Sequence, residues 1–325
     1  MKKFFITGSA GFIGFHLAKK LLDLDCSVLG YDSVNNYYDQ KLKESRLEIL
    51  NSYSKFTFEK NKLENYPALK ESIHKFDPDV IFHFAAQAGV RYSLINPKSY
   101  IDSNIIGTFN LLESIRDLNY EHLFFSSTSS IYGDNKKIPF SETDSTDNQL
   151  SFYAHTKQVN ENMISYYAKL YKTPMTSLRL FTVYGPWGRP DHAIFSFTEN
   201  VLKRQYINVF NNGESTRDFT YIDDLVDAIV SMLDKEQIYT HKILHKKFNI
   251  GSEKPIKILD FIKIIEDKLN LKAKKNYMPL QEGDMLNTFS DSTAIRRIIG
   301  DFAKTNLNDG ISEFAEWYKS FYRNK

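Results

Sequence analysis

A short apolar run near the start of the chain leads directly into three evenly spaced glycines. The run Lys3–Thr7 reads KFFIT, which is typical of a buried strand, and Gly8, Gly11 and Gly14 follow it with the spacing G-x-x-G-x-x-G. Over Phe12–Leu24 apolar residues recur at helical spacing, so the glycines lie in a turn between a strand and a helix. Such a turn lets the backbone approach a pyrophosphate, whose negative charge is held by amide groups at the helix N-terminus.

The glycine turn alone is equally compatible with a structural role, but a carboxylate further along supports the nucleotide interpretation. A second apolar run, Ser27–Tyr31, is closed by Asp32, 18 residues beyond Gly14. A carboxylate at this position can hydrogen-bond the ribose hydroxyls of a dinucleotide and repels a 2′-phosphate. The pattern therefore predicts NAD in preference to NADP, and a solvated strand end is the alternative interpretation of Asp32.

Short apolar runs alternate with amphipathic stretches through the first half of the chain. We expect strands at Val80–Phe84, His122–Ser127 and Met175–Leu180, and helices at Asn104–Leu118 and Tyr153–Tyr171. Alternating strands and helices are typical of β-α-β units with a parallel sheet, and right-handed crossovers make such a sheet doubly wound. The expected fold class is therefore α/β, with a Rossmann-type doubly wound parallel sheet.

The pattern changes after about residue 180. Residues Thr182–Asp191 (TVYGPWGRPD) contain two glycines and two prolines, so they are predicted to form a loop. The remainder mixes short helices and strands and ends in an amphipathic helix at Gly310–Tyr322. We predict a dinucleotide-binding domain at 1–180 and a smaller mixed α/β substrate domain at 181–325, with some crossing of the chain between them. The polar segment Asp32–Ser54 is expected to be a loop and a surface helix, without chemistry beyond its first residue.

Tyr153 and Lys157 form a Tyr-x-x-x-Lys pair at the start of a helical pattern. Residues four apart share one helix face, so the ammonium is expected near the phenol. A nearby positive charge lowers the pKa of a tyrosine from about 10, which lets the phenolate act as a general base. The same pair also occurs by chance on ordinary helix faces. The hydroxyl-rich run Ser126–Ser130 supports the catalytic interpretation, because it is expected at a strand end where ligands of α/β sheets gather.

The composition excludes several other classes of protein. Among 325 residues, 42 Lys and Arg nearly balance 40 Asp and Glu, and this balance argues against a dedicated nucleic-acid binder. Cys26 is the single cysteine, so an internal disulfide is impossible, and the eight histidines show no metal-ligand spacing. No apolar run approaches the roughly 20 residues that span a bilayer. We therefore expect a cytoplasmic protein that binds neither a metal ion nor a membrane.

Taken together, these motifs resemble the extended short-chain dehydrogenase/reductase family, and within it the nucleotide-sugar epimerases. The resemblance extends over nearly the whole chain and includes the further motifs His83–Ala86, Asn104, Tyr132–Gly133, Thr182–Pro186, Arg217–Phe219, Asp223–Asp224 and Gly283–Asp284. It implies a Rossmann-type domain that holds NAD and a C-terminal domain that holds a nucleotide sugar. The NAD contacts expected on this basis are Gly8, Gly11, Phe12, Ile13, Gly14, Asp32, Lys62, Leu63, Phe84, Ala85, Ala86, Asn104, Tyr153 and Lys157.

In that family a hydroxyl partner of the catalytic tyrosine lies four residues before the tyrosine of the Tyr-Gly pair. The resemblance therefore implies a catalytic set of Thr128, Tyr153 and Lys157, and the two serines before Thr128 are expected to bond to backbone. Relatives that dehydrate their sugar carry Asp-Glu directly after this threonine, whereas this chain has Ser129 and Ser130. Because these hydroxyls cannot supply the acid/base pair of a dehydration, we expect only removal of hydride at C4 and its return to the other face.

Two longer runs, Ala85–Ser93 and Phe181–Asp191, look like those of UDP-glucuronate 4-epimerases, which interconvert UDP-glucuronate and UDP-galacturonate. Hydroxyls hold a carboxylate by hydrogen bonds and arginines add charge, although surface-loop roles are the alternative for the arginines. The candidates for holding the sugar and its carboxylate are Gln87, Arg91, Thr128, Ser129, Ser130, Tyr153, Thr182 and Arg189. The alternative functions are a 4-epimerase of neutral UDP-hexoses, a UDP-glucuronate decarboxylase and a non-catalytic NAD-binding regulator.

The resemblance also implies how the nucleotide half of a UDP-sugar is held. Val209 and Phe210 are expected at the uracil, Arg217 at the diphosphate and Asp284 at the ribose hydroxyls. One position departs from the family: where relatives have an Asp bonded to the adenine amino group, this chain has Lys62, which has no acceptor. Loss of that bond is expected to weaken retention of NAD unless a neighbouring acceptor replaces it.

A homodimer is expected by resemblance, through a four-helix bundle built from Asn104–Leu118 and Tyr153–Tyr171. Periodicity alone also allows these faces to pack inside a single chain. Besides a UDP-sugar and a second copy of the chain, no partner is predicted, and neither nucleic acid nor a membrane is expected to bind.

Overall fold

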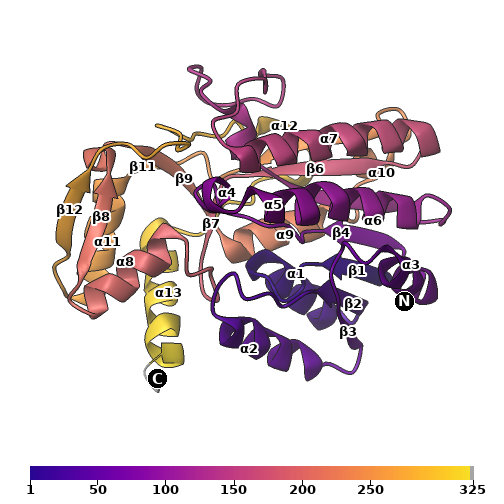
Figure 1. Ribbon diagram of the computed structural model, residues 1–325, viewed down its shortest axis with the longest axis horizontal. Coiled ribbons are helices and arrows are strands. Elements are labelled where there is room, and N and C mark those ends of the chain that lie inside the picture. The colour runs from indigo at the N-terminus through magenta and orange to yellow at the C-terminus, as the bar shows by residue number, and fades with distance from the viewer. Residues whose placement is uncertain (323–325) are drawn as a thin grey trace.

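The computed structural model describes residues 1–322 and is built around a seven-stranded parallel sheet (Figure 1). The spatial order is β10-β6-β5-β4-β1-β2-β3, and every neighbouring pair is parallel. The strands are β1 (Lys3–Thr7), β2 (Ser27–Asp32), β3 (Phe56–Lys60), β4 (Val80–His83), β5 (His122–Thr128), β6 (Met175–Leu180) and β10 (His245–Ile250). The central strands are almost entirely buried, because helices cover both faces. The predicted α/β fold class with a Rossmann-type doubly wound sheet is confirmed.

Helices form a layer on each face of this sheet. They are α1 (Phe12–Asp23), α2 (Gln40–Asn51), α3 (Tyr66–Phe76), α4 (Tyr92–Ile95), α5 (Pro97–Tyr100), a π-helix (Ile101–Ile106), α6 (Gly107–Ile115), α7 (Phe152–Tyr171), α9 (Ile222–Met232), α10 (Glu236–Tyr239) and α12 (Thr293–Ile299). Helix α1 packs against α2 and α9, whereas α6 packs against α3 and α7. Alternate side chains of β1 serve the two layers, since Phe4 and Ile6 join the core around α1 and Phe5 joins the core around α6.

The second half of the chain builds a smaller mixed region, at the left of Figure 1. One sheet has the order β11-β9-β7, with β9 antiparallel to β11 and parallel to β7, and β12 pairs with β8 in another. The elements are β7 (Thr182–Tyr184), β8 (Tyr206–Phe210), β9 (Thr216–Tyr221), β11 (Pro255–Lys257), β12 (Lys274–Met278), α8 (Ala193–Leu202), α11 (Ile258–Leu269), α13 (Leu307–Tyr322) and 3₁₀ turns at Ser129–Tyr132 and Asn211–Gly213. The loop predicted for Thr182–Asp191 begins with a strand instead, because its first three residues pair with β9.

The chain crosses back into the large sheet after β9. Helix α9 packs on α1, and β10 pairs with β6 from His245↔Met175 to Ile250↔Leu180. Strand β10 is therefore an edge of the large sheet, although it follows the smaller region in sequence. The division into domains at residue 180 stays a proposal, with α9 and β10 as the crossing segment.

The segment between β2 and β3 contains a helix, as predicted, but this helix is more than a surface element. Leu42, Arg46 and Leu50 of α2 are all fully buried. The Arg46 guanidinium donates to the carbonyl of Ala10 at 2.8 Å and to the carbonyl of Trp187 at 2.6 Å. It therefore joins the glycine turn to the loop after β7, a role that satisfies a buried charge with backbone acceptors.

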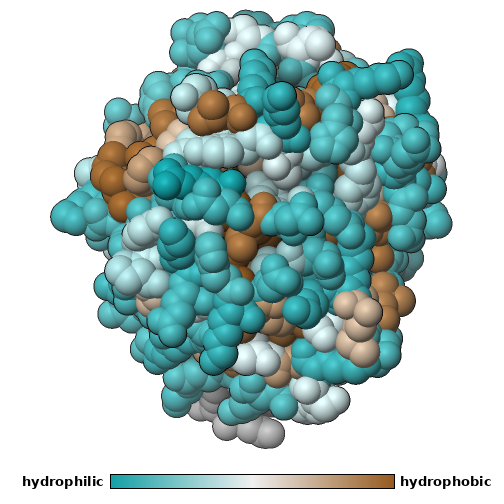
Figure 2. Space-filling model, turned by 90° about the vertical axis from the view of Figure 1, so that its right-hand side faces the viewer, coloured by the Kyte–Doolittle hydropathy of each residue, from teal (hydrophilic) through white to brown (hydrophobic). Residues whose placement is uncertain are grey.

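The side of the molecule that carries the N-terminus, on the right of Figure 1, is mostly hydrophilic. Figure 2 shows its hydrophobic side chains in small, separate groups. Within residues 1–322 no helix is both long enough and apolar enough to cross a bilayer. The same described residues contain no group of His, Cys, Asp or Glu arranged to bind a metal ion.

Candidate active site

A cavity of about 870 Å³ opens at the C-terminal ends of β1, β2, β4 and β5, where they face the smaller region. This is the edge at which doubly wound sheets bind ligands, and the volume suits a cofactor together with a substrate. Most residues predicted from the sequence line it: Gly8, Gly11, Phe12, Ile13, Gly14, Asp32, Lys62, Leu63, Phe84, Ala85, Ala86, Gln87, Arg91, Thr128, Ser129, Ser130, Tyr153, Lys157, Thr182, Arg189 and Asp284. Four predicted residues are not in this lining: Asn104, Val209, Phe210 and Arg217.

The glycine turn is packed too closely for side chains. Gly8 has a φ of +79°, and a Cβ there would lie 2.6 Å from the backbone nitrogen of Ala85. A Cβ on Gly14 would lie 2.2 Å from the carbonyl oxygen of Gly8, which already accepts from the Gly11 amide at 2.9 Å. The turn therefore presents bare backbone to the cavity at the start of α1, where the positive end of the helix favours an anion.

Asp32 is oriented by backbone amides at the end of β2. Its carboxylate accepts from Ala10 at 3.1 Å and from Val34 at 2.8 Å. Lys43 of α2, which sequence reasoning does not single out, also lines the cavity and donates to Asn35 Oδ1 at 2.6 Å. Burial lowers the pKa of Lys43 to about 8, and the charge of Asp32 opposes this effect. A carboxylate and an ammonium therefore flank the part of the cavity where the adenosine ribose is expected.

Tyr153, at the start of α7, and Thr128, at the end of β5, meet in the cavity. Burial raises the pKa of the Tyr153 phenol, while the charge of Arg189 and a hydrogen bond with Thr128 lower it. Thr128 Oγ1 also accepts from the amide of Ser130 at 3.2 Å, which orients it at the start of the 3₁₀ turn. A phenol beside an oriented hydroxyl can exchange a proton with a bound alcohol.

Lys157 follows Tyr153 by one helical turn and is almost completely buried. Its ammonium donates to the carbonyl of Ser126 at 2.7 Å and lies 4.6 Å from the centre of the Phe125 ring. Burial lowers the pKa of Lys157 to about 7, and the charge of Glu161 opposes this effect. The described contacts of the ammonium are thus with β5, and its effect on the pKa of Tyr153 stays a prediction.

Asn104 supports the cavity from behind its wall. In the π-helix, its side chain accepts from the amide of Gln87 at 2.8 Å and donates to Thr156 Oγ1 at 2.9 Å. It therefore ties the loop after β4 to α7, next to Lys157. Short π-helical segments such as this one are frequent at functional sites. A direct contact of Asn104 with NAD stays a prediction.

A charged cluster from the loop after β7 lies beside the phenol. Arg189 Nη2 is 2.6 Å from His192 Nε2 and 3.5 Å from the Asp191 carboxylate. Burial and the charge of Arg189 lower the pKa of His192 to about 4, so the neutral ring accepts this hydrogen bond. Tyr37, from the loop after β2, donates to Asp191 at 3.2 Å. Sequence reasoning predicts only Arg189 of this cluster, because Tyr37 and Asp191 are 154 residues apart.

Of the residues predicted to hold the nucleotide, Asp284 lines the cavity, whereas Val209, Phe210 and Arg217 lie outside the lining. Val209 is buried, and the Phe210 ring centre lies 5.0 Å from the Arg91 guanidinium. Arg217 donates to two backbone carbonyls at 2.9 and 3.0 Å. Burial lowers its pKa, and the charge of Asp284 opposes this effect. Contacts of these side chains with uracil, ribose and diphosphate stay predictions.

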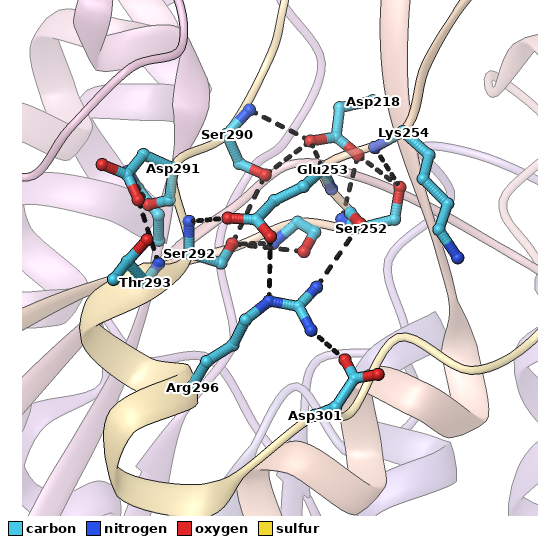
Figure 3. Close-up of polar contacts among 12 residues, drawn as sticks. Asp218, Ser252, Glu253, Lys254, Ser290, Asp291, Ser292, Thr293, Arg296 and Asp301 are labelled. Carbon is cyan, nitrogen blue, oxygen red and sulfur yellow. Dashed lines mark hydrogen bonds and ion pairs between the residues drawn. The ribbon is translucent and has the colours of Figure 1, made fainter.

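The carboxylate next to Arg217 is the centre of a buried polar network (Figure 3). Asp218 accepts from the amide and hydroxyl of Ser252 at 2.9 and 2.6 Å, and from those of Ser290 at 3.0 and 2.5 Å. The amide of Glu253 is a fifth donor at 3.2 Å. Because a buried carboxylate needs such donors to replace its hydration, the network fastens β9 to the turn before β11 and to the segment before α12. It thereby fixes the strand that carries Arg217.

The chain as a whole is similar to proteins of a known family. The model of the NAD dependent epimerase/dehydratase family matches residues 4–251. "Protein CapI" of Staphylococcus aureus is 46% identical, covering 99% of both chains, and the "Probable UDP-glucuronate 4-epimerase" of Rhizobium meliloti is 41% identical, covering 99% of this chain and 98% of its own. A crystal structure of UDP-glucuronic acid 4-epimerase from Bacillus cereus, in complex with UDP-glucuronic acid and NAD, is similar with a TM-score of 0.92. Its identity is 32%, over 98% of this chain and 100% of that one.

Proposed function

Because the chain belongs to the NAD dependent epimerase/dehydratase family, we propose that it interconverts UDP-glucuronate and UDP-galacturonate by 4-epimerisation. The observation that carries the proposal is one cavity that joins the glycine turn and Asp32 to Thr128 and Tyr153, with serines directly after the threonine. Relatives named as UDP-glucuronate 4-epimerases are 39–41% identical over at least 98% of this chain. The similar Bacillus cereus enzyme holds UDP-glucuronic acid and NAD.

The cavity fits NAD on its own geometry. The turn at Gly8 and Gly14 leaves no room for a Cβ, so a pyrophosphate can reach the backbone amides of α1. Asp32 is already oriented by two amides, and a ribose diol suits its remaining acceptor capacity. When bound, NAD would supply the group that accepts the hydride from C4 and later gives the hydride back to that carbon.

Tyr153 is the residue placed to move the proton of the C4 hydroxyl. Thr128 orients the same oxygen, and together with the charge of Arg189 it lowers the pKa of the phenol against the effect of burial. The sugar turns about its diphosphate to offer its other face, and Tyr153 then returns the proton to the C4 oxygen. Lys157 holds the end of β5 beside the phenol through the carbonyl of Ser126.

The first experiment is proton NMR of the purified protein with UDP-glucuronate and added NAD. We expect UDP-galacturonate to form without CO2 or a pentose. A UDP-pentose product would assign decarboxylation instead. Turnover of UDP-glucose or an N-acetyl hexose, with none of UDP-glucuronate, would assign a neutral sugar, and binding of NAD without any turnover would indicate a regulator.

A 4-keto uronate is a β-keto acid. It loses CO2 when the bond to its carboxylate is aligned with the π system of the ketone. Thr182 and the serines after Thr128 line the cavity and are the candidates for holding the carboxylate out of line. Thr182→Ala is therefore expected to raise the ratio of CO2 released to epimer formed about ten-fold, the effect of one lost hydrogen bond to a charged group. NMR measures both products. Thr182→Ser is the control and keeps the native ratio, and an equal ratio in Thr182→Ala would show that this hydroxyl does not restrain the carboxylate.

Lys62 lies in the cavity where the resemblance places an acceptor for the adenine amino group. Its backbone is anchored, since its amide donates to Asn61 Oδ1 at 2.9 Å and its carbonyl accepts from the Tyr31 hydroxyl at 3.2 Å. Lys62→Asp is therefore expected to bind NAD about ten-fold more tightly in calorimetry, because a carboxylate accepts the amino proton. Lys60→Asp, an exposed change outside the cavity lining, is the charge-matched control. Equal affinities would show that the adenine amino group is not bound at this position.

We also propose that two copies associate through α6 and α7, which lie side by side (Figure 1). Val159, Tyr166 and Leu170 form an exposed apolar stripe on α7, and Phe109 is exposed on α6. The same pair of helices from a second copy would cover these side chains in a four-helix bundle. Light scattering of the wild-type protein is expected to give twice the mass of one chain. The Phe109→Glu variant is expected to give the mass of a single chain. A cytoplasmic location is part of the proposal and agrees with the single free cysteine.

A further inference from the structure

Behind the catalytic helix lies a buried ion pair that the proposed mechanism does not use. Glu161, two turns after Tyr153 on α7, faces Arg179 of β6, with Oε2–Nη2 at 2.9 Å and Oε1–Nε at 3.1 Å. The two side chains are 0% and 1% exposed. Such a pair loses much of its attraction to desolvation, and apolar side chains of similar volume often stabilise a core as well. Stability alone therefore does not explain these charges at this place.

The Glu161 carboxylate is bonded to β5 directly beside the catalytic hydroxyl. Ser127 Oγ donates to Glu161 Oε1 at 2.6 Å, and Ser127 is the residue before Thr128. The carbonyl of Ser126 accepts from Lys157 at 2.7 Å. Two consecutive residues of β5 are thus bonded to two side chains that lie one turn apart on α7. The expectation that both serines bond to backbone is wrong for Ser127.

The far side of the ion pair is also held. Arg179 Nη1 donates to the Tyr132 hydroxyl at 3.0 Å, and its guanidinium lies 5.1 Å from the centre of that ring. The same hydroxyl donates to Asn249 Oδ1 of β10 at 2.6 Å, and the Lys247 ammonium lies 3.4 Å from Glu161. Residues of β5, β6 and β10 therefore hold the Glu161 side chain. Because Glu161 belongs to α7, these contacts fix the position of α7 relative to the sheet.

We propose that Ser127 and Glu161 are positioning residues, which together fix the register of α7 against β5. Helix α7 carries Tyr153 and β5 carries Thr128, so this register sets whether the phenol and the hydroxyl reach the same sugar oxygen. A misplacement of about 1 Å can cost two orders of magnitude in rate. The inference rests on the proposed function for the identity of that oxygen.

The charge of Glu161 has a second effect, on Lys157. Burial lowers the pKa of Lys157 to about 7, and Glu161 opposes that effect. The other ionisable groups that pack around this part of α7 are Tyr153 on the helix itself, Arg179 on β6, Lys247 and His245 on β10, and His83 on β4. Burial and the charge of Lys157 lower the pKa of His83 to about 3, so its ring stays neutral. Burial lowers the pKa of His245 to about 4 against the charge of Glu161, so this ring also stays neutral. Removing the Glu161 charge therefore lowers the pKa of Lys157 further.

Ser127→Ala tests the register while leaving the ion pair in place. We expect kcat for UDP-glucuronate to fall roughly ten-fold, with KM and NAD affinity changed less than about two-fold. Ser177→Ala on β6 is the matched control, because it removes a buried hydroxyl that is 2.8 Å from His245 Nε2 and lies outside the cavity lining. It is expected to lower the melting temperature as much as Ser127→Ala but to keep the native kcat. Ser127→Thr keeps the hydroxyl and is expected to recover most of the activity.

Glu161→Gln tests the charge through the pH profile of kcat. The limb that follows the protonation of Lys157 is expected to move to lower pH, because Lys157 loses its proton earlier. A merely structural role would leave that limb in place. If Glu161→Gln does not fold, the comparison of Ser127→Ala with Ser177→Ala still decides the question.

Equal kcat values for Ser127→Ala and the wild-type protein would overturn the positioning role. A wild-type protein that epimerises a neutral UDP-hexose and not UDP-glucuronate would overturn the proposed substrate alone, and the same variants are then compared on that hexose. Failure to turn over any UDP-sugar would overturn both proposals.

Discussion

Tyr153→Phe is expected to lower kcat for epimerisation by roughly a thousand-fold, with folding and the binding of NAD and UDP-glucuronate retained. The substitution removes only the phenol oxygen, which is the group proposed to take the C4 hydroxyl proton. The ring keeps its packing against Tyr100, whose centroid is 6.0 Å away. KM is therefore expected to change little, and the loss of activity is expected to appear in kcat. Product formation by NMR and thermal melting measure the two parts of this expectation.

Tyr53→Phe provides the matched control for this prediction. It removes a tyrosine hydroxyl that donates to Asp23 at 2.6 Å, outside the cavity lining. We expect its kcat to equal that of the wild-type protein. A native kcat in Tyr153→Phe as well would show that another group takes the proton, and Thr128 would become the next candidate.

Arg189→Leu is expected to lower kcat/KM for UDP-glucuronate roughly a hundred-fold, if the predicted charge-assisted contact of Arg189 with the carboxylate is lost. It is also expected to move the acid limb of the pH profile to higher pH. The charge of Arg189 lowers the pKa of Tyr153, and a general base works above its pKa. Removing the charge raises that pKa, so activity appears only at higher pH. Initial rates measured across the pH range test both effects.

Two further arginine variants separate charge from geometry. Arg189→Lys keeps the charge but not the planar fork, so it is expected to keep the acid limb and to lose part of kcat/KM. Arg297→Leu, an exposed change on α12, is the control and is expected to alter neither. An acid limb that stays in place in Arg189→Leu would show that this charge does not act on the phenol.

The parts of the molecule with a local signal were predictable from the sequence. The backbone of the turn requires Gly8 and Gly14, and the helix period places Tyr153 and Lys157 on one face. Strands β1 and β6 have the predicted bounds, and α7 begins one residue before the predicted helix. These signals are local because they depend on a few neighbouring residues, and together they define the edge of the sheet where the cavity forms.

The rest of the fold and of the site depends on which distant segments come into contact. The local sequence pattern does not indicate these contacts. A buried Arg46 looks like any polar residue on a surface helix, since nothing nearby in sequence marks its backbone acceptors. The bond between Tyr37 and Asp191 joins two loops that only the fold brings together. Glu161 and Arg179 belong to different elements, so helical spacing does not reveal their pairing.

The place of β10 in the chain has a consequence for synthesis on the ribosome. Once residue 180 has been made, six strands of the large sheet are present, but the outer edge of β6 has no neighbour until residues 245–250 emerge. An unpaired edge of this kind invites pairing with other nascent chains. The large sheet is therefore complete only after much of the smaller region has been translated, so a gene cut at codon 180 is expected to encode an aggregation-prone fragment.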